Sequence, residues 1–191
     1  MLDFQSIRDK KVKLQELVNG LTKEDMRHEL NEMYDEVMHL IADCTDTHVM
    51  FEPIDKKADD PYAVEGEEYI AWTLGHVIVH ITASMEESAT IASELARGVV
   101  YHGRSRWEVP WREVTTIEQC NTRMEESRKM CLASLEMWPN PPHIDNTYIP
   151  AIQGALPHTC ISRFASGLKH ASDHIEQIAD IVRQADATLS R

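Results

Sequence analysis

The sequence predicts an all-α protein, a bundle of four core helices with one extra helical segment at the N-terminus. Glycine and proline number only seven and eight and occur in clusters, which leaves long stretches free to form helices. Apolar residues in these stretches recur at helical spacing. No run shows the alternation of β-branched residues that is typical of strands. With 191 residues, of which 42% are hydrophobic, the chain suffices for a single domain over residues 1–191.

The N-terminal helical segment spans Asp3 to Val18, and Gly20 ends it. The first core helix follows at once. Thr22 can cap it with Asp25 in its first turn, and its apolar face continues to Ile41. The two segments form either one broken helix or two separate ones.

A loop is expected from about His48 to Tyr69, followed by the second core helix from about Trp72 to Arg97, which Gly98 stops. Residues 98–114 contain glycine and proline and form a long link. Such a link is long enough to run the length of a bundle, so the helices on either side of it can be parallel.

The third core helix begins at Thr115 or Thr116, each of which has a capping-box partner three residues later. The proline-rich sequence at residues 138–142 closes it. The last core helix covers about Thr159 to Ala187, after a second link that ends at Pro157.

The charge of the chain is strongly acidic, with 32 Asp and Glu against 19 Lys and Arg and a net charge of -13. A phosphate backbone is bound by a face rich in lysine and arginine, which this balance does not favour. We therefore expect no nucleic acid as a partner.

The cysteines and the N-terminal residues bear on the location of the protein. The four cysteines are too widely spaced for a zinc motif and too few for a secreted disulfide scaffold. The first residues lack the basic and apolar stretches of a signal peptide, and no apolar run has spanning character. We expect a cytoplasmic protein without a membrane partner.

Ten histidines stand out, and four of them form two H-x3-H pairs, His76 with His80 and His170 with His174. Four residues advance about one helical turn, so each pair can present two imidazoles to one metal ion. Random placement would give about 0.5 such pairs, so the spacing alone is weak evidence.

Helical-wheel positions distinguish these four histidines. At about 100° per residue, His170 and His174 lie roughly 90 to 130° from the centre of the apolar stripe on the last helix. On the second core helix His80 lies about 110° from the centre of the stripe, whereas His76 lies about 150° away and points further outward. His80, His170 and His174 therefore border the core, where they can line one groove. For His76 we favour a solvated role or a role beside the ligands over direct ligation.

Two segments carry a family resemblance. The sequence Trp72 to Ile81 resembles the start of the second helix in the DinB-like superfamily, also called the damage-inducible or YfiT-like metalloenzymes, where a tryptophan precedes a metal-binding histidine by eight residues. His170 to Ile178 looks like the family's last-helix motif, H-x3-H followed by a small residue, glutamine and an aliphatic residue. Glu176 departs from it, because many members have glycine there. The resemblance covers about residues 22–188.

The resemblance implies a four-helix bundle of up-down-down-up topology in which His80, His170 and His174 bind a metal ion. Three neutral imidazoles suit a divalent ion, with Zn²⁺ and Ni²⁺ the leading candidates, and leave positions open for water or substrate. Family members include S-transferases acting on low-molecular-weight thiols and related isomerases and hydrolases. Asp173 and Glu176 lie within a turn of the ligands, where each is either a residue that orients an imidazole or accepts a proton, or a solvated carboxylate.

Two functions remain open. The leading hypothesis is a metal-dependent enzyme that activates a thiol or water to attack a small molecule, with no catalytic residue identified beyond the ligands. The alternative is a non-catalytic metal-binding module for association or for binding a small ligand. A homodimer is expected because such bundles often bury a helix face between subunits.

Overall fold

The computed structural model describes residues 1–56, 58–60, 63–104 and 106–189, so that the last two residues of the expected 1–191 domain lie outside it. The described residues form helices joined by loops, and the only β-type pairing among them is an isolated bridge between Tyr148 and His158. The predicted all-α class is confirmed. The long helices are α3 (Lys23–Leu40), α5 (Leu74–Ala96), α6 (Ile117–Glu136), α7 (Cys160–Asp173) and α8 (Ile175–Leu189).

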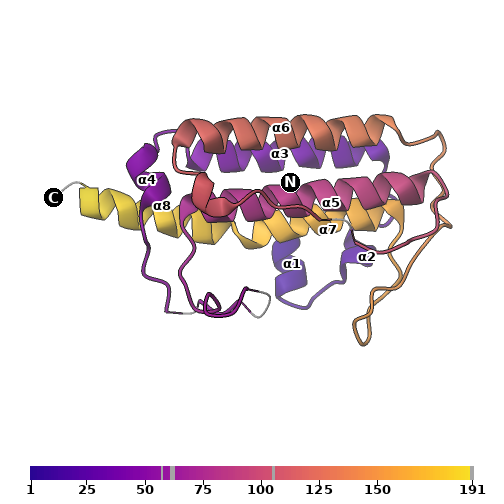
Figure 1. The fold of residues 1–191 in the computed structure, drawn as a ribbon. Helices are drawn as coiled ribbons and strands as arrows, with labels where there is room; N and C mark the ends of the chain where they lie inside the picture. The colour runs from indigo at the N-terminus through magenta and orange to yellow at the C-terminus, as the bar shows by residue number, and fades with distance from the viewer. Residues whose placement is uncertain (57, 61–62, 105, 190–191) are drawn as a thin grey trace.

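Helices α3, α5, α6 and α7 lie side by side, and α8 continues from the end of α7 (Figure 1). Helix α5 packs against α6 and α7, and α3 packs against α6, α7 and α8. Their apolar faces meet in one core. Its largest fully buried side chains include Met26, Leu30 and Met33 of α3, Leu74, Ile78, Ile81 and Met85 of α5, Met124 of α6, and Phe164 of α7. Burial of each such side chain contributes about 1.5–3 kcal/mol.

The link of residues 98–114 returns along α5, as its length allows (Figure 1). The link begins at the C-terminal end of α5. There Asn146, which belongs to the later link ending at Pro157, donates to Leu95 O. Further along the link Arg104 pairs with Glu87 at 2.7 Å. At the end of the link, a Cβ on Gly75 would lie only 2.6 Å from Val114 O. Helices α5 and α6 therefore start at the same end of the molecule, and the link covers one side of α5.

The expected capping residues begin two of the helices. Thr22 caps α3 by accepting from Asp25 N at 3.3 Å, and Asp25 Oδ2 accepts from Thr22 N at 2.7 Å. Thr116 and Gln119 cap α6 in the same reciprocal way. These local bonds satisfy N–H groups that have no partner inside the helix.

Three details of the expected helices are wrong. The segment 3–18 forms two short helices, α1 (Phe4–Arg8) and α2 (Leu14–Leu17), because Lys10 adopts a left-handed φ of 58° between them. The expected loop from His48 starts inside a short helix, α4 (Asp46–Met50). The last core helix is interrupted at His174, whose N–H bonds to Ala171 O at 3.0 Å, three residues back instead of four.

Gly167 lets α5 and α7 approach closely. A Cβ at this position would lie 2.6 Å from Ser88 Cβ and 2.9 Å from Met85 Sδ, both on α5. Distances below about 3 Å are not tolerated between carbon atoms, so a larger residue would push the helices apart. This contact lies one turn before His170.

Candidate metal centre

Three histidines meet at one point, with a ligand atom of each within 4.8 Å of the others: His80, His170 and His174. His80 comes from α5, His170 from the end of α7, and His174 from the junction of α7 and α8. The Nε2 atoms of His80 and His170 lie 2.8 Å apart. These are the three residues that the sequence predicts as ligands.

The position of His174 depends on the interruption between α7 and α8. In a regular helix the imidazoles of His170 and His174 would stack one turn apart. Here the rings of His170 and His174 make an edge contact at 70° with centroids 4.9 Å apart. Each ring also lies within 5.0 Å, centroid to centroid, of the His80 ring. The tighter turn at His174 thus accompanies a close cluster of three rings.

The side chain of Gln177 fixes which nitrogen of His174 can bind an ion. Its Oε1 lies 2.8 Å from His174 Nδ1. An amide oxygen only accepts hydrogen bonds, so Nδ1 carries the proton and Nε2 keeps its lone pair. Gln177 lies three residues after His174, one turn along α8. The motif itself therefore supplies the residue that orients this imidazole.

His80 contacts two charged residues of the 98–114 link. Arg106 Nη2 lies 3.1 Å from His80 Nδ1 and 3.4 Å from His80 O. Glu108 Oε1 lies 3.5 Å from the same Nδ1, and Arg106 also pairs with Glu108. The outer nitrogen of His80 thus faces both a cation and a carboxylate.

The three imidazoles are neutral at neutral pH. Burial, together with the charge of Arg106, lowers the pKa of His80 to about 4. Burial and the neighbouring His174 and His80 lower the pKa of His170 to about 3. Burial also lowers the pKa of His174. Uncharged imidazoles are the form in which histidine binds metals.

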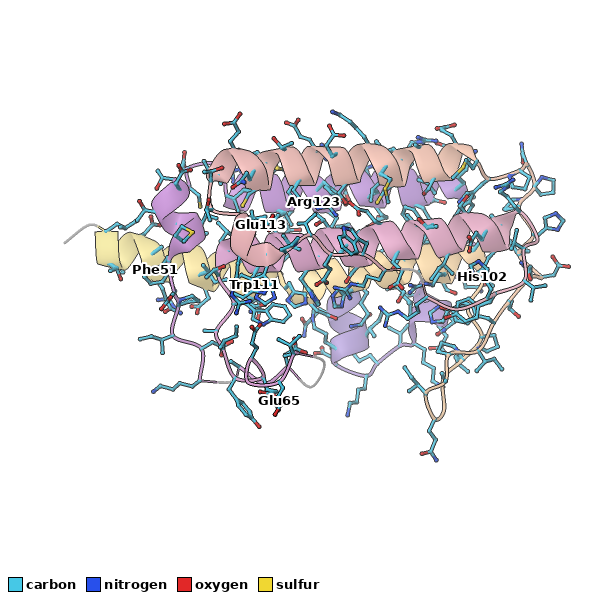
Figure 2. All side chains as sticks on the ribbon, viewed as in Figure 1. Phe51, Glu65, His102, Trp111, Glu113 and Arg123 are labelled. Carbon is cyan, nitrogen blue, oxygen red and sulfur yellow. The ribbon has the colours of Figure 1, made fainter. Side chains whose placement is uncertain are left out.

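Aromatic rings form a wall beside the cluster. The Trp72 ring lies 4.6 Å from the His80 ring and 5.7 Å from the His174 ring, centroid to centroid. Trp72 also stacks on His76 at 4.4 Å, and Trp111 stacks on the other side of His76 at 4.4 Å with an interplanar angle of 2°. Trp111 belongs to the short 3-10 helix η1 (Trp111–Glu113). Figure 2 labels Trp111 and Glu113, the two end residues of this helix.

The expectation that His76 points outward is wrong. Its side chain is buried, at 9% exposure, between the two tryptophans. Burial lowers the pKa of His76 to about 4. The helical wheel described only the apolar stripe of α5, whereas Trp72 and Trp111 cover the opposite side. His76 is not among the three clustered ligands, and a role beside them remains a prediction.

Asp173 and Glu176 lie at the rim. Asp173 pairs with Arg8 at 3.1 Å and with Lys169 at 2.6 Å, and its exposed carboxylate links α7 to α1. Glu176 is exposed on α8. The hydrogen bonds described for the ligand rings instead join His80 to Arg106, His174 to Gln177, and His80 to His170.

A groove of about 430 Å³ adjoins the cluster. Its lining includes Trp72, His174 and Gln177 together with Ile54 and Ile70 of the loop before α5. Six acidic residues also line it: Asp55, Asp59, Asp60, Asp173, Glu176 and Asp180. A small molecule in this groove would contact His174 directly.

The cluster fits a divalent metal ion. Zinc binds imidazole nitrogen at about 2.0–2.1 Å, so nitrogens that share one ion lie roughly 3–4 Å apart. The three ligand atoms here are within 4.8 Å of one another and come from neutral rings that are partly buried. Three protein ligands leave at least one coordination position open, which is typical of catalytic sites.

Several residues around the ligands were not predicted to belong to the site. Gln177 has a local signal, because it lies three residues from a predicted ligand. Arg106, Glu108 and Trp111 have none, because their link meets α5 only after the chain folds back. Comparison with protein-family models, curated proteins and solved structures found no match.

Proposed function

We propose that this protein is a metal-dependent enzyme of the DinB-like superfamily, in which His80, His170 and His174 hold Zn²⁺ or Ni²⁺. The observation that carries the proposal is the convergence of the three ligand atoms within 4.8 Å. The ligands come from the two segments that resemble that superfamily, one at the start of α5 and one across the junction of α7 and α8. Chance spacing explains two H-x3-H pairs in a sequence, but it does not explain a meeting of one pair with His80 from another helix.

The ion, when bound, would supply a Lewis acid that lowers the pKa of a thiol or water or polarises a carbonyl group. The chain's own residues would position the reactants. Gln177 holds His174 in the ligand form, Trp72 excludes water from one side of the rings, and the groove admits a small substrate. This arrangement suits S-transfer, isomerisation or hydrolysis of a small molecule.

A low-molecular-weight thiol is the leading candidate for the nucleophile. The protein's own thiols are poor candidates because all four cysteines are buried, and burial raises the pKa of Cys120 to about 12. A thiolate is the reactive form, so an external thiol activated at the site would be more nucleophilic than these side chains at neutral pH.

The proposal extends to the fold, the assembly and the location of the protein. The common start of α5 and α6 and the returning 98–114 link support a four-helix bundle of up-down-down-up topology. Within the described residues, no helix combines the length and apolarity needed to cross a membrane. A homodimer, a cytoplasmic location and the absence of a nucleic-acid partner remain part of the proposal.

The alternative function is a non-catalytic helical module that binds metal for association or small-ligand binding. The ion pairs of Asp173, at the rim of the site, favour this alternative. Asp173 is already paired with Arg8 and Lys169, which lowers its value as a proton acceptor near the ligands.

Metal analysis tests the site itself. Protein purified without a histidine tag should contain close to one equivalent of Zn²⁺ or Ni²⁺ per chain, and His80→Ala and His174→Ala should lose it. His102→Ala is the matched control, because His102 is an exposed histidine that pairs with Glu94. Metal retained in both ligand variants would overturn the proposed site.

Turnover distinguishes the enzyme from the module. The metal-loaded protein would be assayed with a panel of cellular thiols and small electrophiles, alongside the metal-free protein and His174→Ala. Turnover that is lost with the metal supports the enzyme. Stoichiometric metal without turnover across the panel favours the module.

A further inference from the structure

The outer nitrogen of His80 faces two residues that demand opposite hydrogen positions. Arg106 Nη2 lies 3.1 Å from His80 Nδ1, and a guanidinium only donates. Where Arg106 donates to it, Nδ1 must carry a lone pair. The ring proton of neutral His80 then lies on Nε2, the nitrogen that faces His170 Nε2 at 2.8 Å.

This tautomer cannot bind an ion at Nε2. A metal bond needs the Nε2 lone pair, so the proton of the neutral ring must be on Nδ1 instead. A proton on Nδ1 needs an acceptor, because the ring is largely buried. Glu108 Oε1, at 3.5 Å from Nδ1, is that acceptor among the described contacts of His80.

We propose that Glu108 is a positioning residue that accepts the Nδ1–H of His80 in the metal-bound protein, and that Arg106 holds His80 in the opposite tautomer in the metal-free protein. The inference rests on the proposed metal site. It assigns opposite effects to two neighbouring residues of the link: Glu108 favours ion binding, and Arg106 opposes it. Arg106 and Glu108 also pair with each other. His80 Nδ1 can therefore exchange Arg106 for Glu108 as its partner when the ion binds.

The contrast with His174 supports this assignment. Gln177 Oε1 already accepts from His174 Nδ1, so His174 is set for ligation without any change of partner. His80 is the ring whose present partner disfavours ligation. Metal binding therefore requires a rearrangement at His80 that the other oriented ligand does not need.

The first test measures Zn²⁺ affinity by competition with a chromophoric chelator at constant pH. Glu108→Ala and Glu108→Asp should each bind Zn²⁺ about 10- to 100-fold more weakly than wild type, as is usual when a partner of a ligand histidine is removed. Glu108→Asp keeps the negative charge but shortens the side chain. It therefore separates the hydrogen bond to His80 from the electrostatic attraction between the carboxylate and the ion. Arg106→Met should bind more tightly. Glu113→Gln, which neutralises an exposed glutamate of η1, should match wild type.

The second test reads the tautomer directly from the ¹⁵N shifts of His80. Metal-free wild type should show the Nε2–H form, and both Zn²⁺-loaded wild type and metal-free Arg106→Met should show the Nδ1–H form. A structural role alone would not move this signature. Circular dichroism verifies that each variant is folded.

The outcomes separate the two levels of the proposal. Wild type that binds no Zn²⁺ overturns the metal site and this inference together. Wild type that binds Zn²⁺ while Glu108→Asp and Glu108→Ala keep its affinity within about twofold overturns the inference alone. An Nδ1–H tautomer of His80 in the metal-free wild type also overturns it.

Discussion

The Nε2 atoms of His80 and His170 lie 2.8 Å apart, although 90 positions separate the two residues in the chain. The contact exists because α5 and α7 pack together with Gly167 facing Ser88. The stability of that helix contact and the geometry of the histidine cluster are therefore linked. A change at Gly167 should therefore affect both the packing of α5 against α7 and the histidine cluster.

Gly167→Ala should destabilise the protein. Alanine has the higher helix propensity by about 1 kcal/mol, but its Cβ would lie 2.6 Å from Ser88 Cβ. Separating the helices to relieve such a contact costs about 1–3 kcal/mol, which outweighs the propensity gain. Urea unfolding followed by circular dichroism measures the change, with Ser166→Ala on the same helix as control. A variant as stable as wild type would show that the two helices can adjust freely.

Burial of His76 should make the stability of the metal-free protein depend on pH. The pKa of His76 falls from 6.5 to about 4 on folding. As the pH falls from 6.5 toward 4, the unfolded chain takes up a proton at this residue and the folded protein does not. The stabilisation is therefore complete above pH 6.5 and is lost progressively below it.

The His76→Phe variant measures this contribution, because phenylalanine can keep the stacking between the two tryptophans. Between pH 7 and pH 5 the free energy of unfolding of wild type should fall by about 2 kcal/mol more than that of the variant. Urea unfolding at both pH values, in the presence of a chelator, provides the comparison. Equal losses in the two proteins would contradict a lowered pKa at His76.

Removal of Trp72 should raise the pKa values of the ligand histidines. Its ring lies against those of His80 and His174, and burial is the main cause of their lowered pKa values. Trp72→Ala admits water to this side, so both pKa values should rise toward 6.5, by about 1 unit or more. NMR titration of the metal-free protein measures them, and Trp107→Ala at an exposed site is the control. Unchanged pKa values would show that other groups exclude the water.

The cysteines should be unreactive in the folded protein. All four are buried, and burial raises the pKa of each, to about 11 for Cys44 and Cys160 and to about 12 for Cys120 and Cys131. At neutral pH almost none is thiolate, the form that reacts. Ellman's reagent should therefore titrate no thiol within minutes in native buffer and all four in guanidinium chloride. Rapid reaction of one thiol in native buffer would identify an accessible cysteine and reopen a role for it.

Local signals in the sequence predicted those parts of the fold that local physics controls. Thr22 and Thr116 cap helices because their side-chain bonds reach only three residues along the chain. The three candidate ligands were also predicted, because their helical-wheel positions place His80, His170 and His174 at the borders of apolar stripes. The resemblance to known motifs selected the same three residues, which the structure brings together.

The tertiary structure decided how these ligands are surrounded. His76 is buried because Trp111 returns over α5 from the far end of a long link. Arg106 and Glu108 reach His80 by the same return, and no periodicity in the sequence marks that meeting. The sequence by itself determined the long core helices, the caps of two of them and the candidate ligands, since these depend mainly on neighbours a few residues away. Burial, hydrogen-bond partners and pKa values depend on which distant segments pack together, so only the folded chain determines them.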